Sequence, residues 1–413
     1  MTLARRWAPY AAIVLALLIV SWRIIRFKMI PDHIEIAASS RLNILETYHY
    51  TTLLANYFTE GFIRRGVPGS IFYFIRSLGY EHSLILFHGL AAVWLGAPLL
   101  ILLRRLAQIQ GRTWIWLTLV LVLSPQLFMA WARDVARSDM LSAGFIAWAL
   151  LACLGRRYLL AALVLFVGSQ THETALAFGG SLCAAVAFLD WRAGAVKPGR
   201  LFAALGLLGA LWIVATAAQQ FIGPSPQAVA RDMVAHARDL SHPTYWAIYN
   251  TVGGFRALGT SACLAFGSSS VYVYVAGAVV VLALYGFILP ACSRLRLGLL
   301  LFACYLPMVV LSVLAIDYGR WLSFAVLNWW LINAALHLRG VDPLAIKHWP
   351  PRISIAAALA VLMMGPGGYL SANLATQKIA GRLSKHDAPA ADRIDMCDPT
   401  WRSVVPTKAA PQP

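Results

Sequence analysis

The sequence predicts an all-α fold, a polytopic integral membrane protein with about eleven transmembrane helices. Of its 413 residues, 60% are hydrophobic and 12% are charged, whereas an ordinary soluble domain carries roughly 25% charged residues. The apolar residues also gather in runs long enough to cross a bilayer, and basic residues recur between alternate runs. These three observations indicate that lipid surrounds most of the chain.

The apolar runs place the helices in chain order. Runs of roughly 18 or more mainly apolar residues are typical of membrane spans. They lie near 8–25, 83–103, 114–131, 140–155, 174–190, 201–222, 271–291, 298–315, 321–338 and 353–372. A shorter run at 158–168 is expected to pair with 174–190 as a tight hairpin. The first run is not followed by small residues, so it reads as an uncleaved span rather than a signal peptide.

The loop charges predict the topology. With a cytoplasmic N-terminus, every inner loop is basic, as the positive-inside rule requires. These inner residues are Arg104, Arg105, Arg112, Arg156, Arg157, Arg192, Lys197, Arg200, Arg294, Arg296, Arg339, Lys347 and Arg352. The short outer turns carry mixed charge instead. We therefore expect a periplasmic C-terminus in a bacterial inner membrane, although the long outer loop after the first span is itself basic.

Two outer segments are too long to be simple turns. In the first, 28–80, apolar residues recur at helical spacing from Ile44 to Phe62, which predicts an amphipathic helix lying on the membrane. Val67–Ile75 is too short to span, so it re-enters or lies flat. The second segment is 223–270. Together these predict one transmembrane domain over 1–372, followed by a flexible outer tail over 373–413.

Net charge and cysteine content exclude some classes of protein. The formal net charge is +17, but the basic residues lie in short clusters between apolar runs, which indicates topology and not nucleic-acid binding. The six cysteines show no CxxC or metal-ligand spacing. Five of them sit in apolar runs, so no disulfide is expected.

Charged residues at the outer membrane boundary are the candidate site. A charge at the membrane centre costs about 2.5–3.5 kcal/mol, so charges placed there usually face a polar cavity. In WARDVARSDM, Arg133 and Arg137 stand four apart, a spacing suited to a phosphate or carboxylate. The alternative is a capped helix start in which Asp134 and Asp139 neutralise both arginines.

Two further outer turns carry candidate residues. GSQTHETALAFGG places His172 and Glu173 at a break between apolar segments, where they could form an acid–base pair or simply cap the next helix. IDYGRW places Asp317 and Arg320 three apart, either at a site or as a local ion pair.

The first outer loop adds another carboxylate and two cations. YFTEGFIRRG joins Glu60 to Arg64 and Arg65, which suggests a general base beside a pyrophosphate clamp. The alternative is that these arginines bind anionic lipid headgroups. Other titratable residues in the two outer segments are Asp32, Glu35, Glu46, His49, His236, Arg238, Asp239 and His242.

Several motifs are absent from the sequence. It contains no Walker loop, GxGxxG or GxSxG, and no long cytoplasmic loop. An outward-facing site would therefore need a donor already delivered across the membrane, such as a lipid-linked phosphate or pyrophosphate.

The segments ARDVARSDMLSAGFIAWALLA and GRRYLLAALVLFVGSQTHETALAF resemble the EpsG-like exopolysaccharide polymerase family and, more distantly, the GT-C class of multi-span glycosyltransferases. The resemblance covers about 60 residues well and matches Arg133 or Arg137 and His172 to family positions. It implies glycosyl transfer from a polyprenyl-linked saccharide on the periplasmic face, with possible polysaccharide assembly proteins as partners.

This chemistry suggests a role for each candidate. Arg133, Arg137 and Arg320 would hold the pyrophosphate, and Glu173 or Glu60 would be the base. His172 and Asp317 would orient the reacting groups. No ligand spacing demands a metal, although a divalent cation is compatible with such a site.

Two other functions fit the same residues. A transporter or flippase of lipid-linked glycans would need the same arginines, but it would be expected to show pseudo-symmetric halves, which the sequence lacks. A non-catalytic membrane protein of envelope assembly would not depend on His172, Glu173 or Arg137.

Overall fold

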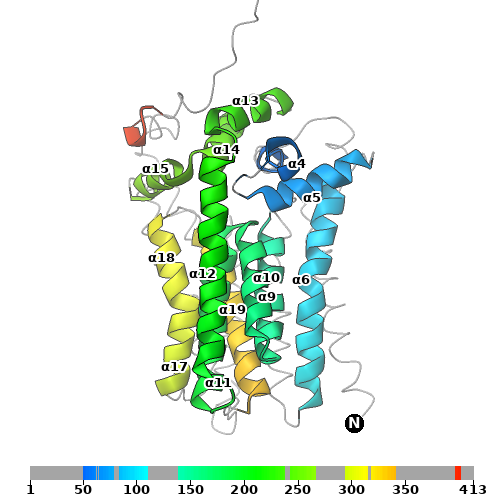
Figure 1. Cartoon of the computed structure of the whole chain (residues 1–413), viewed down its shortest axis with the longest axis vertical. Coiled ribbons are helices and arrows are strands. Elements are labelled where there is room, and N and C mark those ends of the chain that lie inside the picture. The colour runs from blue at the N-terminus through cyan, green and yellow to red at the C-terminus, as the bar shows by residue number, and fades with distance from the viewer. Residues whose placement is uncertain are drawn as a thin grey trace, which may run out of the picture.

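The computed structural model describes residues 50–61, 63, 65–78, 83–109, 138–237, 242–266, 294–314, 318–340 and 396–400. In this part of the chain every regular element is helical (Figure 1). The helices are α4 (Tyr57–Glu60), α5 (Gly66–Ser77), α6 (Ser83–Gln108), α9 (Asp139–Leu154), α10 (Tyr158–Ser169), α11 (Glu173–Arg192), α12 (Pro198–Phe221), α13 (Pro226–His236), α14 (His242–Val252), α15 (Gly254–Phe266), α17 (Arg294–Leu300), the π-helical turn η1 (Leu301–Tyr305), α18 (Leu306–Leu314) and α19 (Tyr318–Leu338).

The described part of the chain contains helices that could span a membrane. Among the described residues, three helical segments are long and apolar enough to cross a bilayer, namely Leu86–Gln108, Glu173–Arg192 and Pro198–Phe221. The other predicted runs from 140 to 338 that the structure describes are helical as well. The runs at 8–25, 114–131, 271–291 and 353–372 lie outside the described residues, so the number of spans stays a prediction.

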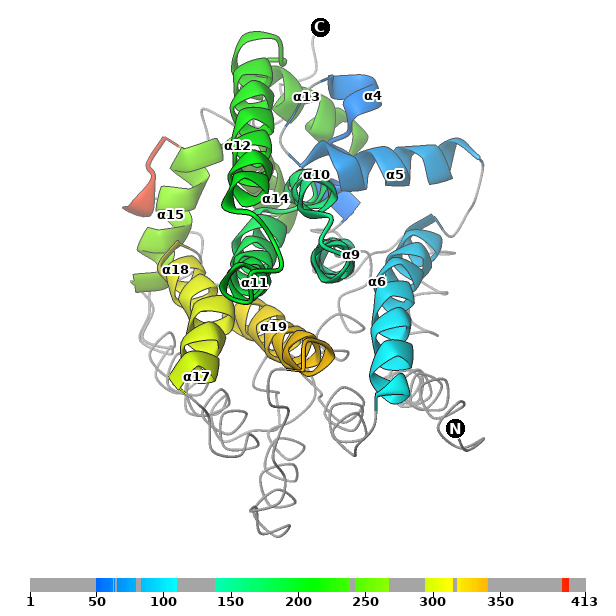
Figure 2. The same ribbon diagram turned by 60° about the horizontal axis from the view of Figure 1, so that its bottom comes forward.

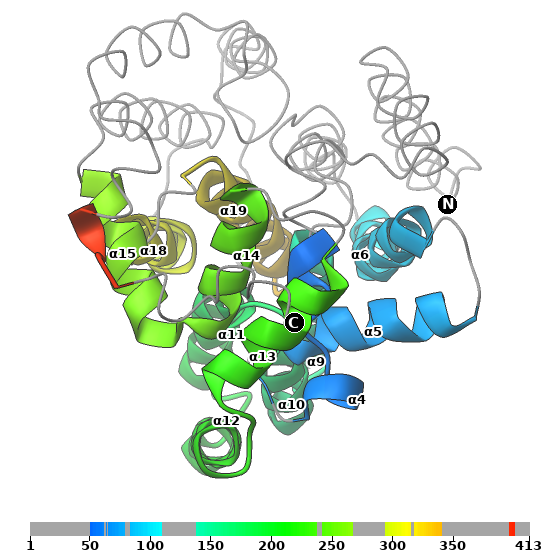
Figure 3. The ribbon, with the colours of Figure 1, turned by 90° about the horizontal axis from the view of Figure 1, so that it is seen from above.

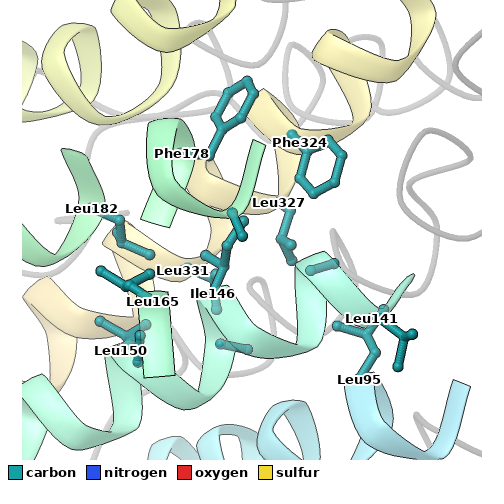
Figure 4. Close-up of a cluster of buried hydrophobic side chains, with 14 of the residues drawn as sticks. Leu95, Leu141, Ile146, Leu150, Leu165, Phe178, Leu182, Phe324, Leu327 and Leu331 are labelled. Carbon is teal, nitrogen blue, oxygen red and sulfur yellow. The ribbon is translucent and has the colours of Figure 1, made fainter. Parts of the chain in front are cut away.

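The core of the bundle is built from α9, α10, α11 and α19 (Figure 4). Phe178 of α11 stacks on Phe324 of α19 with 5.4 Å between ring centroids. The predicted hairpin of α10 and α11 is confirmed, and glycines let its helices approach closely. A Cβ at Gly179 would overlap Leu165, and one at Gly168 would overlap Phe145. Small residues at such crossings are typical of membrane helices, because they bring the backbones into contact.

One end of the bundle carries a cap of short helices, formed by α4, α5, α13, α14 and α15 (top of Figure 1). Helix α5, which contains Val67–Ile75, lies across this end and not along the bundle, as the view from above also shows (Figure 3). The outer segment 223–270 supplies α13–α15. The cap therefore combines the two segments that the sequence placed on the same face.

The predicted continuous helix from Ile44 to Phe62 is wrong within the described residues. A new helix, α4, starts after Asn56, whose extended backbone and side-chain oxygen cap the N–H groups of Phe58 and Thr59. It ends at Gly61, which has φ 72°. A positive φ suits glycine because no Cβ clashes there. Local capping therefore outweighs the apolar periodicity.

The other end of the bundle holds the turn from α9 to α10 and the turn from α11 to α12, both predicted to be cytoplasmic (Figure 2). There Asp190 of α11 accepts hydrogen bonds from Tyr158 Oη at 2.5 Å and Arg339 Nη2 at 2.6 Å. Arg339 also donates to the carbonyl of Cys153. This buried ion pair ties α9, α10, α11 and the end of α19 together.

A disulfide joins Cys263 of α15 to Cys397, so the expectation of no disulfide is wrong. The two cysteines are separated by 134 positions in the sequence, a distance at which spacing rules give no signal. Next to it, Asp398 accepts hydrogen bonds from Arg256 Nε at 2.7 Å and Tyr249 Oη at 2.6 Å. Residues 396–400 of the predicted flexible tail are therefore fixed to the cap.

Candidate functional site

The turn between α10 and α11 carries His172, a residue of the candidate site. Thr171 donates a hydrogen bond from its hydroxyl to the Gly168 carbonyl, and shares another of 2.8 Å with Ser142 of α9. His172 is buried and caps α11, since its Nδ1 accepts a hydrogen bond from the Thr174 N–H. His172 therefore caps the helix, and its Nδ1 also lies 3.5 Å from Glu173 Oε2, so the pairing of these two residues stays a prediction. Because Nδ1 is an acceptor, the neutral ring carries its proton on Nε2.

Arg65 and Glu173 are brought together from segments more than 100 positions apart in the sequence. Arg65 Nη2 lies 2.6 Å from Glu173 Oε2, and Arg65 Nε donates to both carboxylate oxygens at 3.0 and 3.3 Å. Each side chain is 28% exposed. Such charge-assisted pairs are strong and geometrically defined. Because the guanidinium occupies both oxygens, Glu173 is a poor candidate for a base, and Arg65 is a poor candidate for a pyrophosphate clamp.

Helix α4 contacts the same turn. Tyr57 donates a hydrogen bond from its hydroxyl to Gln170 Oε1 at 3.4 Å, and its backbone N–H donates to Ser70 Oγ at 2.9 Å. Burial raises the pKa of Tyr57 to about 12, so its hydroxyl stays protonated and remains a donor. A Cβ at Gly66 would overlap the Tyr57 ring. These contacts fix the first outer segment against the turn that carries His172 and Glu173.

Glu60, at the end of α4, is the acid of the described cap helices whose pKa is raised. It is buried, and its carboxyl hydrogen-bonds with that of Asp232 on α13. Burial first, and then the hydrogen bond and the charge of Asp232, raise the pKa of Glu60 to about 8. Two carboxyls can share a hydrogen bond only when one of them is protonated. Asp232 Oδ1 also lies 3.3 Å from His236 Nδ1.

Asp232 is the residue that the sequence did not reveal as part of this group. His236 was a candidate, and its spacing of four from Asp232 on one helix is the signal that could have extended the cluster. The partner on α4 could not be found this way, because α4 and α13 belong to different outer segments. Only the folded cap brings Glu60 and Asp232 together.

The remaining predicted site residues are not placed. Arg64, Arg133, Arg137 and Asp317 lie outside the residues that the structure describes. Arg320 belongs to the first turn of α19, but its side chain is not described.

The neighbouring elements do approach the site. The ring of Trp321, in the first turn of α19, lies 6.3 Å from the His172 ring. Ser142, in the first turn of α9, touches Thr171. Asp139, one turn earlier, is buried. The helix starts that follow Asp317 and Arg137 therefore lie beside the turn that carries His172.

Across the described ranges, no group of three His, Cys, Asp or Glu side chains is arranged to hold a metal ion. Comparisons of the chain with protein-family models, curated proteins and solved structures give no match. The resemblance to EpsG-like polymerases therefore rests on the two sequence segments that carry it. The geometry of the cap is the other basis for a proposed reaction.

Proposed function

We propose that the chain is a membrane glycosyltransferase of the polysaccharide-polymerase kind, which transfers sugar from a polyprenyl-linked donor at the capped end of the bundle. The observation that carries the proposal is the carboxyl pair formed by Glu60, which is buried in the cap, and Asp232, whose side chain is 37% exposed. It lies on the segment that Arg65 and Tyr57 fix to the turn of His172 and Glu173.

Glycosyl transfer needs a base for the acceptor hydroxyl. In the proposed step, the acceptor oxygen forms a bond to the anomeric carbon of the donor sugar, and the bond from that carbon to the pyrophosphate oxygen breaks. The hydroxyl proton passes to ionised Glu60, and the lipid pyrophosphate leaves with the electron pair. A base works best when its pKa is near the working pH. A pKa of about 8 meets this requirement, so Glu60 is a better candidate than Glu173.

The leaving pyrophosphate needs cations in the same place. Arg65 is already paired with Glu173, so we assign the pyrophosphate to Arg133, Arg137 and Arg320. The support for this assignment comes from the starts of α9 and α19, which lie beside the turn of His172. In this scheme His172 holds the start of α11, and Asp317 orients the reacting groups.

The disulfide supports a periplasmic position for the cap. Disulfides form and persist in oxidising compartments such as the bacterial periplasm, and they are rare in the cytosol. The bond of Cys263 to Cys397 starts from α15, which lies at the same end of the bundle as α4, the helix that carries Glu60 (Figure 1). We therefore propose an inner-membrane protein with a cytoplasmic N-terminus and the cap outside, where a flipped lipid-linked donor is available.

The test is the glycan profile of cells that lack the protein, complemented with variants. Glu60→Gln removes the base, and Arg137→Ala removes a proposed pyrophosphate ligand. Arg231→Gln, on the exposed residue beside Asp232, is the matched control. We expect shortened or missing polymer for the first two variants at normal membrane levels, and normal polymer for the control.

The fate of the precursor separates the rival functions. A polymerase that has lost its base leaves unpolymerised lipid-linked units on the outer side of the membrane. A lost flippase strands these units inside. Normal polymer in the Glu60→Gln and Arg137→Ala strains would instead indicate a non-catalytic assembly protein and overturn the proposal.

A further inference from the structure

The helices α4 and α5 expose large apolar side chains on the outer surface of the cap. The exposed fractions are 68% for Phe58, 58% for Phe74, 57% for Leu78 and 41% for Tyr73. Phe58 and Tyr73 stack with 5.4 Å between ring centroids, so the two helices form one continuous surface. The opposite side of α5, with Phe72 and Ile75, is already buried in the core. This second apolar side of α5 is therefore not buried in the core formed by the described residues.

The charge at the edge of this surface, where it meets the core side of α5, is positive. Arg76 is exposed, and its guanidinium carbon lies 5.8 Å from the ring centroid of Tyr50 and 5.9 Å from that of Phe72. The single acidic residue of α4 and α5, Glu60, is buried and faces Asp232. Apolar side chains next to an exposed guanidinium match the boundary between the acyl chains and the phosphates of a phospholipid leaflet.

The position of α5 matches that boundary. It lies across the end of the bundle, immediately before α6. The membrane-crossing part of α6 starts at Leu86, and its residues Leu86, Leu90 and Val93 are exposed along one side of the helix. Because these residues must face acyl chains if α6 crosses the membrane, the lipid-facing surface begins shortly after Leu78. A surface at this depth meets headgroups.

We infer that the exposed surface of α4 and α5 is a lipid-docking surface, with Phe58, Phe74 and Leu78 inserted at the acyl boundary of the outer leaflet and Arg76 on lipid phosphates. These lipid contacts hold the cap at the membrane–water interface through α4 and α5, which belong to the first outer segment. The inference concerns the surface alone and is independent of the proposed glycosyl transfer.

Spin labels measure the depth directly. Single cysteines are introduced as Phe58→Cys, Phe74→Cys, Ala235→Cys and Ile213→Cys, with Cys292→Ser as background. The native cysteines 153, 183 and 304 are buried, and Cys263 and Cys397 are bonded. The full chain carries a nitroxide at each site, in vesicles of phosphatidylethanolamine and phosphatidylglycerol. Collision rates are measured with oxygen, which concentrates in lipid, and with a neutral nickel chelate, which stays in water.

We expect the labels at 58 and 74 to lie roughly 5–10 Å below the phosphates. Ala235 is exposed on α13 and serves as the aqueous control, whereas Ile213 is exposed on α12 and serves as the deep control. Nickel accessibility at 58 and 74 equal to that at 235 would overturn the inference. Protection from both oxygen and nickel would also overturn it, because it would show a protein partner on this surface.

A charge variant tests the role of the guanidinium. With Arg76→Gln, the label at 74 should become shallower in vesicles containing phosphatidylglycerol, and the shift should be smaller in pure phosphatidylcholine. An unchanged depth in both would remove Arg76 from the docking surface. Since all these positions are exposed, the folded state can be verified by an unchanged elution profile in detergent.

Discussion

Two glutamates at the capped end of the bundle, Glu60 of α4 and Glu173 of α11, differ in their partners and therefore in their chemistry. Glu173 forms an ion pair with Arg65. The guanidinium favours the ionised carboxylate and hydrogen-bonds to both of its oxygens. Glu60 faces a second carboxyl and is buried, and both effects favour its protonated form. The same side chain is thus a structural anchor in one place and a proton-holding group in the other.

The Glu60–Asp232 pair predicts a pH-dependent contact between α4 and α13. The pKa of Glu60 is raised above its ordinary value of 4.5 to about 8. A raised pKa contributes stability that is complete below the unfolded value and is lost as pH rises through the folded value. Protease cleavage between α4 and α5 should therefore increase as pH rises from 4.5 to about 8 and level off above that value. Glu60→Gln stays neutral, so its cleavage should not change over this range.

Asp232→Asn should lower the pKa of Glu60, since it removes a negative charge beside the carboxyl while burial remains. Infrared titration of the full chain can follow the carbonyl band of the protonated carboxyl, with Glu60→Gln identifying the band. We expect the midpoint to fall in Asp232→Asn and to stay in the control Arg231→Gln. A midpoint unaffected by Asp232→Asn would show that burial alone sets the pKa.

At the scale of elements, the sequence predicts the helices of the bundle well and those of the cap poorly. The long apolar runs specify spans because no other arrangement satisfies the backbone in lipid. In the cap, Asn56 and Gly61 break a periodic pattern that runs from Ile44 to Phe62. The residues of the candidate site also differ in whether the sequence predicts them. The turn of His172 and Glu173 was predictable, whereas the pairing of Glu60 with Asp232 depends on contact between two distant segments.

Glycines in two consecutive helices, α11 and α12, predict different responses to the same substitution. Gly179→Leu should destabilise the bundle by about 1–3 kcal/mol, because its side chain would overlap Leu165 and overpack the crossing of α10 and α11. Gly206→Leu on α12 is the matched control, since nothing lies within 4 Å of its Cβ position. Thermal unfolding in one detergent compares them. Equal melting temperatures would mean that α10 and α11 are not packed through Gly179.

At the scale of the whole molecule, a buried aspartate at each end of the bundle joins separate segments of the chain. Asp190 joins α10, α11 and α19 at one end. At the other end, Asp398 is held by Arg256 and Tyr249 beside the disulfide. Burial opposes ionisation of Asp398, but hydrogen bonds from Tyr249 and Thr400 together with Arg256 keep its pKa below the ordinary value. Asp398 therefore stays charged at neutral pH and holds the C-terminal residues on the cap.

The disulfide also reports which side of the membrane the cap occupies. In intact spheroplasts, a membrane-impermeant phosphine should reduce the bond between Cys263 and Cys397, after which an impermeant maleimide should label both cysteines. All variants carry Cys292→Ser, and because Cys153, Cys183 and Cys304 are buried in the bundle, they should stay unlabelled in the folded protein. The variant Cys263→Ser/Cys397→Ser should give no labelling, whereas Gly194→Cys in that variant, at the other end of the bundle, should be labelled only after permeabilisation. The reverse pattern would put the cap in the cytoplasm, where no flipped donor reaches it, and the proposed transfer would have no substrate.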